Sequence, residues 1–518
     1  MELIEFLLLK PWFTVVAALI LGIFLFRRTR LLLQLRHIPG PLLSRITGIP
    51  HALGLYGEDF HLYYHELHQK YGPIVAVSPT IVITSDPGLW ARSNTDPRYK
   101  KSKWFYRAVR YDWRSDNIFS EHNTAVHDVR RSQMIRGYSG VENLTLEADI
   151  EACVAKLLNL VRSNYAGKRK SMDLAQKLSF FTLDAISTIG FGKCYDLLNA
   201  DEDPDEYLQS IHDGLEINHR QIALGTWWLN WIPLLSSQPD PDPNKNKGFF
   251  KMTALNDSMV EAREKEFNEQ KKLGVVPRAD MLTSFMKNGL SGKVLKAENL
   301  LQVVAGSDTT SGALKGTMLH VLTNPRVYKA LQAEIDDTVA SDRAPQTPGI
   351  VTHAQAKELK YLQAVIKEGM RIFPPVVVAL SRDTPPEGDT VMIGGQEIRL
   401  PGDVSIIPSI YTMHRNKSVY GEDADVDVFR PERWLEETDE KKLEAMTQEL
   451  NLGFGHGRWL CVGKTIAMRE LSLLIFELFR NFDWTLVNPL NPWKHNVLIG
   501  LHSLSEMWVH VEERAKPQ

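Results

Sequence analysis

FGHGRWLCVG, residues 454–463, combines three glycines, a phenylalanine and a cysteine within ten residues of this 518-residue chain. Glycine permits close approach of the backbone to another group, and backbone angles that other residues avoid. Apolar residues recur at helical spacing after Cys461, so the cysteine lies at the N-terminal end of an expected helix. The helix dipole and the free N–H groups at such an end stabilise a thiolate. The segment therefore predicts a loop that presents a thiolate to a bulky group.

Haem is the bulky group that fits this arrangement best, with Cys461 as the axial ligand of the iron. A thiolate ligand pushes electron density onto the iron and favours cleavage of the O–O bond. The alternative is a buried free cysteine beside a glycine-rich turn, because most free cysteines behave as small apolar residues. We expect the ligand, since the glycines and the start of a helix both accompany this cysteine.

The segment resembles the signature of the haem-thiolate monooxygenases, the cytochrome P450 family, which reads Phe-x-x-Gly-x-Arg-x-Cys-x-Gly. The matching positions are Phe454, Gly457, Cys461 and Gly463. The resemblance implies that these residues, together with Gly455, bind haem b (iron protoporphyrin IX). Within the family, the chain looks most like the membrane-anchored eukaryotic type and is similar to the fungal pisatin demethylase-like group.

One position departs from this signature. Trp459 replaces the arginine two places before the cysteine, and the chain's own arginine stands one place earlier, at Arg458. In the family, the missing arginine helps to hold a haem propionate, so the departure puts that one contact in doubt. The resemblance leaves two roles for Trp459, which are a hydrogen bond from its indole N–H to a propionate and packing alone.

A second motif, Ala305-Gly-Ser-Asp-Thr-Thr310, lies inside a helical pattern over residues 294–322. Its glycine weakens a helix by about 1 kcal/mol relative to alanine, and its hydroxyls can bond back to the i−4 carbonyl and distort the helix. A helix widened in this way could hold a water beside a bound ligand; an ordinary kink in a polar patch is the alternative. The family motif (Ala/Gly)-Gly-x-(Asp/Glu)-Thr-(Thr/Ser) matches throughout. It implies that Asp308 and Thr309 deliver protons to iron-bound oxygen.

Glu368 and Arg371 stand three apart in the helical pattern over 359–372, so that they share one helix face. Alone, such a pair is usually a solvated surface salt bridge worth at most about 1 kcal/mol. The flanking residues are apolar, however, and a buried pair needs further partners that offset its desolvation. Arg433 is the expected partner, because the Glu-x-x-Arg and Pro-Glu-Arg-Phe motifs of the family form a structural triad. Trp434 replaces the usual phenylalanine of the second motif.

Three further residues are expected to hold haem propionates. His127 and Arg131 are four apart in a helical run and share a face, although a solvated pair is the alternative. Many family members have Trp or His and then Arg at these positions. Arg382 follows the strand-like run 376–380 and matches another propionate contact of the family. A guanidinium group suits this role because it pairs bidentately with a carboxylate.

Two groups of residues are expected to line a substrate pocket. Trp104 and Phe105 belong to an aromatic stretch where the family places a substrate-lining loop, and ordinary core aromatics are an equally good interpretation. Val376, Val377, Val378 and Ala379 would lie along the pocket wall in the family layout. An apolar wall implies an apolar substrate.

The N-terminal segment predicts a membrane anchor. An apolar run over residues 6–26 has about the length of a bilayer span. Arginines follow it within residues 27–30, and positive charge marks the cytoplasmic side. Charge after the run disfavours a cleaved signal peptide, and a buried core helix is the other alternative. We expect residues 1–30 to form a single-pass anchor with its basic flank in the endoplasmic reticulum membrane, and residues 31–41 to form a proline-rich hinge to a cytosolic catalytic domain.

Residues 42–518 are expected to form one haem-thiolate monooxygenase domain, mostly α with a minor β region and a hairpin over residues 73–84. The net charge of −3 argues against a nucleic-acid binder. Three scattered cysteines are too few for a disulfide framework and suit a reducing compartment.

These features predict an enzyme that inserts one oxygen atom from O2 into a lipophilic small molecule, in fungal secondary metabolism or in the oxidation of xenobiotics and phytoalexins. The resemblance implies that NADPH supplies electrons through a separate flavin reductase. Cations at Arg130, Arg131, Lys464 and Arg469 suggest docking of an acidic partner. The alternatives are a haem-thiolate isomerase, dehydratase or peroxygenase that needs no reductase, and a non-catalytic haem sensor or electron carrier.

Overall fold

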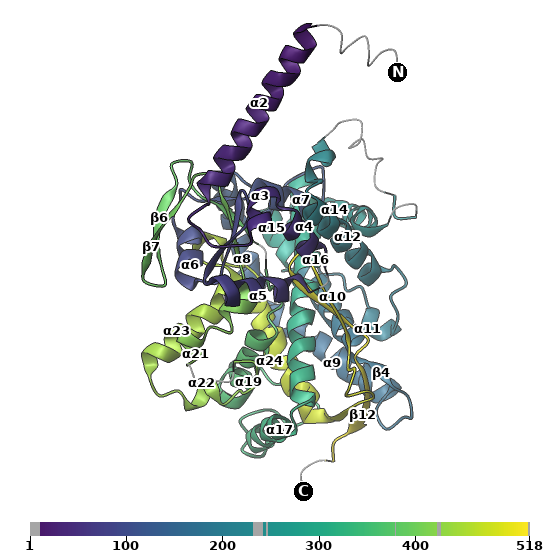
Figure 1. The fold of residues 1–518 in the computed structure, drawn as a ribbon. Coiled ribbons are helices and arrows are strands. Elements are labelled where there is room, and N and C mark those ends of the chain that lie inside the picture. The colour runs from purple at the N-terminus through teal and green to yellow at the C-terminus, as the bar shows by residue number, and fades with distance from the viewer. Residues whose placement is uncertain are drawn as a thin grey trace.

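The structure is a computed structural model that describes residues 11–57, 59–231, 242–244, 247–378, 380–421 and 426–515. Helices make up most of the molecule, and short strands form four small sheets in these ranges (Figure 1). The predicted class, mostly α with a minor β region, is confirmed.

The longer helices are α2 (Pro11–Gln34), α5 (Phe60–Tyr71), α8 (Thr124–Tyr138), α9 (Leu146–Asn164), α10 (Leu174–Phe191), α12 (Tyr207–Leu224), α14 (Gly248–Leu273), α16 (Gly292–Leu322), α17 (Pro325–Ala340), α19 (Lys360–Ile372), α23 (Glu440–Asn451) and α24 (Lys464–Asn481). The shorter helices are α3 (Leu42–Thr47), α4 (Ile49–Tyr56), α6 (Pro87–Thr95), α7 (Lys103–Ala108), α11 (Leu197–Ala200), α15 (Met281–Lys287), α18 (His353–Lys357), α20 (Ile410–Met413), α21 (Lys417–Tyr420) and α22 (Arg433–Glu436). Single 3-10 turns are η1 (Trp227–Trp231), η2 (Leu452–Phe454) and η3 (Gly457–Trp459).

The largest sheet has the strand order β1-β2-β8-β5-β3, with bounds β1 Ile74–Ser78, β2 Ile81–Thr84, β8 Ser405–Pro408, β5 Arg382–Asp383 and β3 Lys100–Lys101. β1 and β2 form the predicted hairpin, and β2 pairs in parallel with β8. The remaining sheets are β4-β12-β9 (Met172–Asp173, Trp508–Glu513, Phe482–Leu486), β10-β11 (Lys494–Leu498, Leu501–Ser505) and β6-β7 (Asp389–Ile393, Gln396–Leu400).

The long helix α16 crosses the middle of the molecule and packs against α10, α14, α19 and α24 (Figure 1). Its side chains are buried on most sides, as expected for a helix inside a large core. Glycines bring α19 into close contact with it. A Cβ added at Gly369 of α19 would lie 2.1 Å from the Thr317 hydroxyl, and one added at Gly316 would lie 2.5 Å from the Phe373 ring. This contact fixes the position of α19 along the axis of α16.

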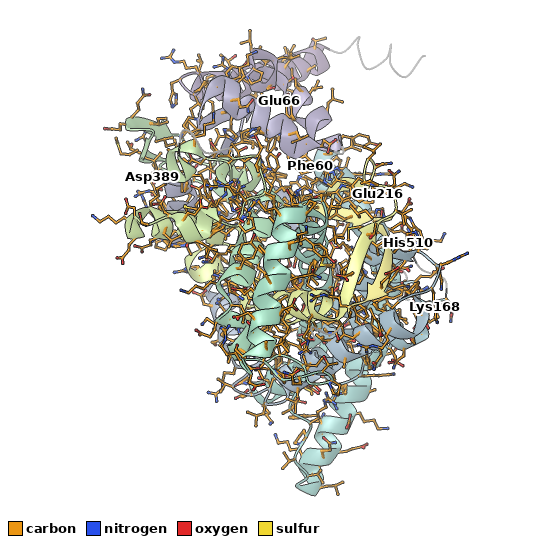
Figure 2. The ribbon with its side chains drawn as sticks, turned by 90° about the horizontal axis from the view of Figure 1, so that it is seen from below. Phe60, Glu66, Lys168, Glu216, Asp389 and His510 are labelled. Atoms are coloured by element: carbon orange, nitrogen blue, oxygen red, sulfur yellow. The ribbon has the colours of Figure 1, made fainter. Side chains whose placement is uncertain are left out.

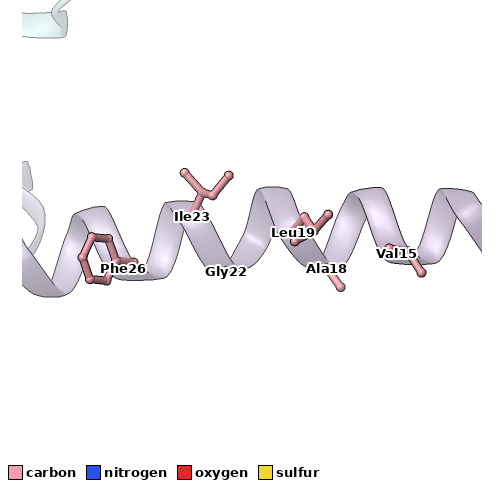
Figure 3. Close-up of a pocket in the computed structure, with 6 residues that line it drawn as sticks. All are labelled: Val15, Ala18, Leu19, Gly22, Ile23 and Phe26. Atoms are coloured by element: carbon pink, nitrogen blue, oxygen red, sulfur yellow. The ribbon is translucent and has the colours of Figure 1, made fainter.

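The N-terminal helix α2 projects away from the body of the protein (Figure 1). A shallow apolar groove follows one of its faces, and Figure 3 shows the side chains that line it: Val15, Ala18, Leu19, Gly22, Ile23 and Phe26. Leu19 is 60% exposed and Phe26 is 69% exposed. In the part of the chain that the structure describes, no helix combines the length and the apolarity needed to cross a bilayer, so the predicted span is not confirmed.

The proline-rich segment after α2 is fixed to the body of the protein. Ala76 of β1 donates its N–H to the Pro39 carbonyl at 2.8 Å, and Ile38 is 1% exposed. Only glycine fits at position 40, because a Cβ there would lie 2.2 Å from the Ala76 oxygen. The segment therefore continues the edge of the large sheet beside β1.

Candidate functional site

The glycine-rich loop before α24 has the tight geometry that its composition predicts. The Cys461 N–H donates to the Phe454 carbonyl at 2.8 Å, which closes the loop. Gly455 has a φ of 79°, and a Cβ at this position would lie 2.6 Å from the Trp459 oxygen. Gly457 has a φ of 57°, in the left-handed region that favours glycine. Gly463 is the residue that precedes α24.

Cys461 is exposed to solvent, although many protein atoms lie around its sulfur. Desolvation raises the pKa of its thiol. The backbone N–H groups of Gly463 and Lys464 and the charges of Arg131 and Lys464 oppose that rise. Without a metal the group is therefore a thiol, and coordination to a metal ion would release its proton.

Trp459 lies at the centre of a group of cationic side chains. The Lys101 ammonium lies 4.4 Å from the centre of the indole ring, and the Arg382 guanidinium carbon lies 5.2 Å from it. The His127 ring centre lies 4.3 Å from the same ring. Arg131 is tied to the loop, since it donates to the Leu460 carbonyl at 2.7 Å. The structure thus brings together the sequence-predicted residues His127, Arg131, Arg382 and Trp459.

These cations have no carboxylate partner. Across the described ranges, no Asp or Glu oxygen lies within 4.0 Å of a nitrogen of Lys101, Arg131 or Arg382. Lys101 instead donates to the Ile118 and Phe119 carbonyls at 2.9 and 2.8 Å, and Nε of Arg382 is buried without a partner. Desolvation, followed by the charge of Arg382, holds the pKa of Lys101 well below its usual range.

Buried cations without counterions fit an anionic group. The two propionates of haem would supply carboxylates at this position, and Cys461 would supply the iron ligand, so the residues present fit this cofactor. Lys101 was missed by the sequence analysis. The sequence gives little indication of this role, because Lys100 and Lys101 are adjacent and neither belongs to a motif. Only the fold shows that Lys101 is buried and Lys100 is exposed.

His127 and Arg458 have roles that spacing did not predict. His127 is hydrogen-bonded through Nδ1 to Asp128 at 2.9 Å, and desolvation, followed by the charge of Lys101, lowers its pKa to about 4. The imidazole is therefore neutral near pH 7. Arg458, the displaced arginine of the loop, approaches the same Asp128 at 3.4 Å, so it is paired on the outer side of His127.

The predicted triad is formed and buried. Arg371 donates bidentately to Glu368 at 2.9 and 2.8 Å, and Arg433 donates to it at 2.9 Å. Glu368 and Arg371 are fully buried, and Arg433 is 4% exposed. Burial would raise the pKa of Glu368, but Arg371 and Arg433 lower it overall. Trp434, which replaces the usual phenylalanine, donates its indole N–H to Glu368 at 2.9 Å and adds a bond that phenylalanine could not make.

Asp308 and Thr309 lie half-buried in the middle of α16, which packs against α24 just after Cys461. The Thr309 hydroxyl donates back to the Ala305 carbonyl at 2.7 Å, as expected from the motif, but α16 stays an α-helix throughout. Desolvation raises the pKa of Asp308, and the charges of Lys315 and His212 oppose the rise. The protonated carboxyl is therefore favoured more than in water.

Trp104 and Phe105 both line an apolar pocket, together with Val378, Ile407 and Ile499. The Trp104 indole N–H donates to Ser405 of β8 at 3.0 Å, which orients the ring, and Phe105 is 4% exposed. The aromatic stretch therefore contributes to a pocket as well as to the core.

Of the residues predicted for the pocket wall, Val378 lines the apolar pocket. Val376 pairs with Leu501 of β11, and Val377 is fully buried with its N–H bonded to the Gly500 carbonyl at 2.9 Å. Neither lines the apolar pocket, whereas Val378 does. Ala379 lies outside the described residues.

The cations expected to dock an acidic partner are not all at the surface. Arg130 is 8% exposed and forms an ion pair with the buried Glu298 of α16 at 3.3 Å. This correction follows from its helix face, which points into the core beside the buried His127. Arg131 and Lys464 are half-buried next to Cys461.

The substitution Lys101→Met is expected to weaken haem retention by about tenfold or more, because a charged hydrogen bond to a carboxylate contributes about 1.5–3 kcal/mol. Methionine keeps the length and removes the charge. The measurement is the rate at which haem transfers to an excess of a haem-binding acceptor protein. Lys100→Met is the matched control, because Lys100 is exposed and donates only to the Pro97 carbonyl. Equal rates in the two variants would contradict the role of Lys101.

Comparison with known proteins identifies the family. The family model described as Cytochrome P450 matches residues 39–508. The chain is 34% identical over 496 residues to "Cytochrome P450 monooxygenase ABA1" of Pyricularia oryzae, with 93% of each chain covered. It is 31% identical over 493 residues to "Cytochrome P450 monooxygenase aba1" of Botryotinia fuckeliana, with 92% of each covered. With the glycine-rich cysteine loop, the buried triad and a family match over most of its length, the chain belongs to the cytochrome P450 family.

Proposed function

We propose that this cytochrome P450 monooxygenase inserts one oxygen atom from O2 into a lipophilic small molecule, in a reaction of fungal secondary metabolism. The observation that carries the proposal is the accessible Cys461 beside buried cations that lack carboxylate partners. The relatives in Pyricularia oryzae and Botryotinia fuckeliana, both named as monooxygenases, support the reaction class. The side chains around Phe105 are apolar, which favours a lipophilic substrate, and the cavity that they enclose in this structure is small, about 20 Å³.

Each part of the site has a distinct task. Cys461 would bind the iron, and Lys101, Arg131 and Arg382 would hold the propionates. Haem, when bound, supplies the activation of dioxygen. The glycine loop keeps the sulfur in place, and Trp459 spaces the cations apart. The buried triad holds α19 against the segment that leads to the loop, so it acts through position and not through contact with the reacting atoms.

Asp308 and Thr309 would supply protons at the site where haem, when bound, would activate dioxygen. The Thr309 hydroxyl donates to Ala305 in the resting arrangement, which leaves its oxygen open to accept a hydrogen bond from water. Rotation about its side-chain bond would then turn the hydroxyl into a donor. Asp308, whose carboxyl is favoured in its protonated form by burial, would replace that proton.

The substitution Thr309→Ala is expected to lower the amount of product formed per NADPH consumed by about a hundredfold, in the range typical of a lost proton-transfer group. Thr309→Ser keeps the hydroxyl and is the matched control, so it should retain most of the coupling. The measurement is the ratio of product to NADPH oxidised. If alanine and serine behave alike, the hydroxyl does not transfer the proton.

We also infer how the protein is placed in the cell. Residues 42–518 would form the catalytic domain, a division supported by the family match over residues 39–508. The exposed apolar face of α2 and the arginines in the C-terminal part of this helix support attachment to the endoplasmic reticulum membrane, with the domain in the cytosol. The segment 31–41, which is bonded to β1, would set the orientation of the domain beneath the membrane.

Labelled oxygen tests the proposed reaction. Haem-loaded protein is supplied with NADPH, a flavin reductase and an extract of metabolites that accumulate when the gene is deleted. We expect a product that carries one heavy-oxygen atom from labelled O2 and forms only when NADPH and reductase are both present. A product without label would indicate an isomerase or dehydratase, and equal turnover with hydrogen peroxide alone would indicate a peroxygenase; either outcome contradicts the proposal.

A further inference from the structure

Three histidines from separate parts of the chain meet away from the Cys461 loop. They are His61 on α5, His495 on β10 and His502 on β11, and one ring nitrogen of each lies within 4.8 Å of one ring nitrogen of the other two. His61 and His502 are each 3% exposed, and the side chain of His495 is 21% exposed. One edge of the cluster is therefore open to solvent, while the other two ligand atoms are inside the protein.

The fold places these side chains on facing surfaces. In the β10–β11 hairpin, His495 pairs with Leu504, so that His502 is its diagonal neighbour on the same face. Nε2 of His495 and Nδ1 of His502 are 2.6 Å apart. The ring of His61 faces both, with its centre 5.0 Å from that of His502 and 5.8 Å from that of His495.

Two nitrogens of the cluster have no hydrogen-bond partner. They are Nδ1 of His61 and Nε2 of His502, and both are buried. A buried polar atom without a partner costs about 1–3 kcal/mol. Desolvation, followed by the charges of His495 and Arg415, lowers the pKa of His61 to about 3. Desolvation and the same neighbours hold the pKa of His502 well below its usual range. Neutral imidazole is the form that binds metal ions.

The charges around the cluster permit a cation. Asp59 lies 3.7 Å from Nδ1 of His495, on the solvent side. A carboxylate that accepts the other ring N–H of a ligating histidine orients it and raises its basicity, and a small shift of Asp59 would form this hydrogen bond. Arg415, the cation that faces the cluster across Tyr411, forms an ion pair with Asp427 at 2.8 Å, which offsets its charge.

We propose that His61, His495 and His502 bind one divalent transition-metal ion, with Zn2+ as the best-suited ion, and that Asp59 is the outer carboxylate. Three neutral imidazoles and a water make a tetrahedral zinc site with Zn–N distances of about 2.0–2.1 Å. Ligand nitrogens in such a site are about 3.4 Å apart, so the hydrogen-bonded nitrogens of His495 and His502, now 2.6 Å apart, would separate and lose this bond as the ion binds. This site is separate from the haem chemistry and does not depend on it.

The metal would fix the hairpin against α5. The tip of the hairpin carries Ile499, which lines the apolar pocket, and Gly500, which accepts the Val377 N–H at 2.9 Å. The backbone N–H of His502 donates to the Pro375 carbonyl at 3.1 Å. A bound ion would thus order a segment that borders the pocket, and the hairpin amides should exchange with deuterium more slowly when zinc is present.

Zinc binding to the haem-loaded full-length protein tests the proposal. The protein is stripped with a chelator and dialysed against zinc chloride, and zinc is counted separately from iron by mass spectrometry. We expect one tightly bound zinc per chain, slower exchange in β10 and β11, and loss of that zinc in His495→Gln. Asp59→Asn is expected to weaken zinc binding by about tenfold, as an outer carboxylate does.

His510→Gln is the matched control, because His510 is an exposed histidine of β12 at the edge of the molecule, away from Phe60, which begins α5 (Figure 2). It should bind zinc as the unaltered protein does. His495 was chosen for substitution because it is the most accessible of the three, so the variant keeps the buried pair. A protein that binds no zinc, or variants His495→Gln and His510→Gln that bind it equally, would overturn the proposal.

Discussion

The substitution Cys461→Ser is expected to remove the haem-thiolate absorbance of the reduced carbon-monoxide complex and all turnover. Serine fits the loop, because its side chain is no larger and the Cys461 N–H bond to Phe454 is made by the backbone. It cannot supply a thiolate, which is the ligand that favours O–O cleavage. The measurement is the absorbance spectrum of the purified variant after reduction and addition of carbon monoxide, together with product formation.

Cys194→Ser is the control for this experiment. Cys194 is a half-buried free cysteine that accepts a hydrogen bond from Lys156 at 3.3 Å, far along the chain from the loop. Its substitution should leave the spectrum unchanged. A Cys461→Ser protein that kept the spectrum of the unaltered protein would show that another residue binds the iron.

The substitution Glu368→Gln is expected to lower the free energy of unfolding by about 3–5 kcal/mol, because it leaves buried cations without their counterion. Arg371 is fully buried and Arg433 is 4% exposed, so neither can recover its hydration without local unfolding. Denaturant titration followed by circular dichroism measures the loss, and the fraction of protein that retains haem reports its effect on the site.

The control for the triad is Glu436→Gln. Glu436 pairs with Arg430 at the surface, where the two side chains are 60% and 43% exposed. Such pairs contribute about 0–1 kcal/mol, so this change should hardly alter the denaturation midpoint. If both variants lost the same free energy of unfolding, the buried triad would contribute no more to stability than a surface ion pair.

The Glu368 carboxylate also predicts that the folded protein loses stability at low pH. The pKa of Glu368 is lowered in the folded protein, since the two arginines outweigh the effect of burial. Its contribution to stability is therefore present above the ordinary carboxyl pKa of 4.5 and is lost as the pH falls through the lowered value. In Glu368→Gln, the denaturation midpoint should depend less on pH below about 4.5.

Local motifs predicted the parts of the site that are close in sequence. The loop at Cys461 and the back-bonded Thr309 follow from residue types within a single turn or loop, where spacing determines geometry. The triad needed one long-range partner, and the apolar flanks of Glu368 indicated that it would be buried. The class of fold followed from the many helical patterns.

The residues that the sequence did not reveal depend on contacts between distant segments. Lys101 lies on a two-residue strand with no periodicity, and only pairing with Arg382 on β5 brings it beside Trp459. The burial of Arg130 could not be predicted, because the sequence does not show which face of α8 contacts α16. The bond from Trp434 to Glu368 was also invisible, since the motif treats that position as a ring alone.

The large sheet connects the segment after α2 to the cations near Trp459. The segment after α2 is bonded to β1 at one edge, while Lys101 and Arg382 stand on β3 and β5 at the other. Four strand spacings of about 4.8 Å separate the outer strands, a distance of about 19 Å. A sheet stretches little along its hydrogen bonds, so the distance between its outer strands is fixed. A surface that held the N-terminal helix would therefore lie at a fixed distance from the cations Lys101 and Arg382.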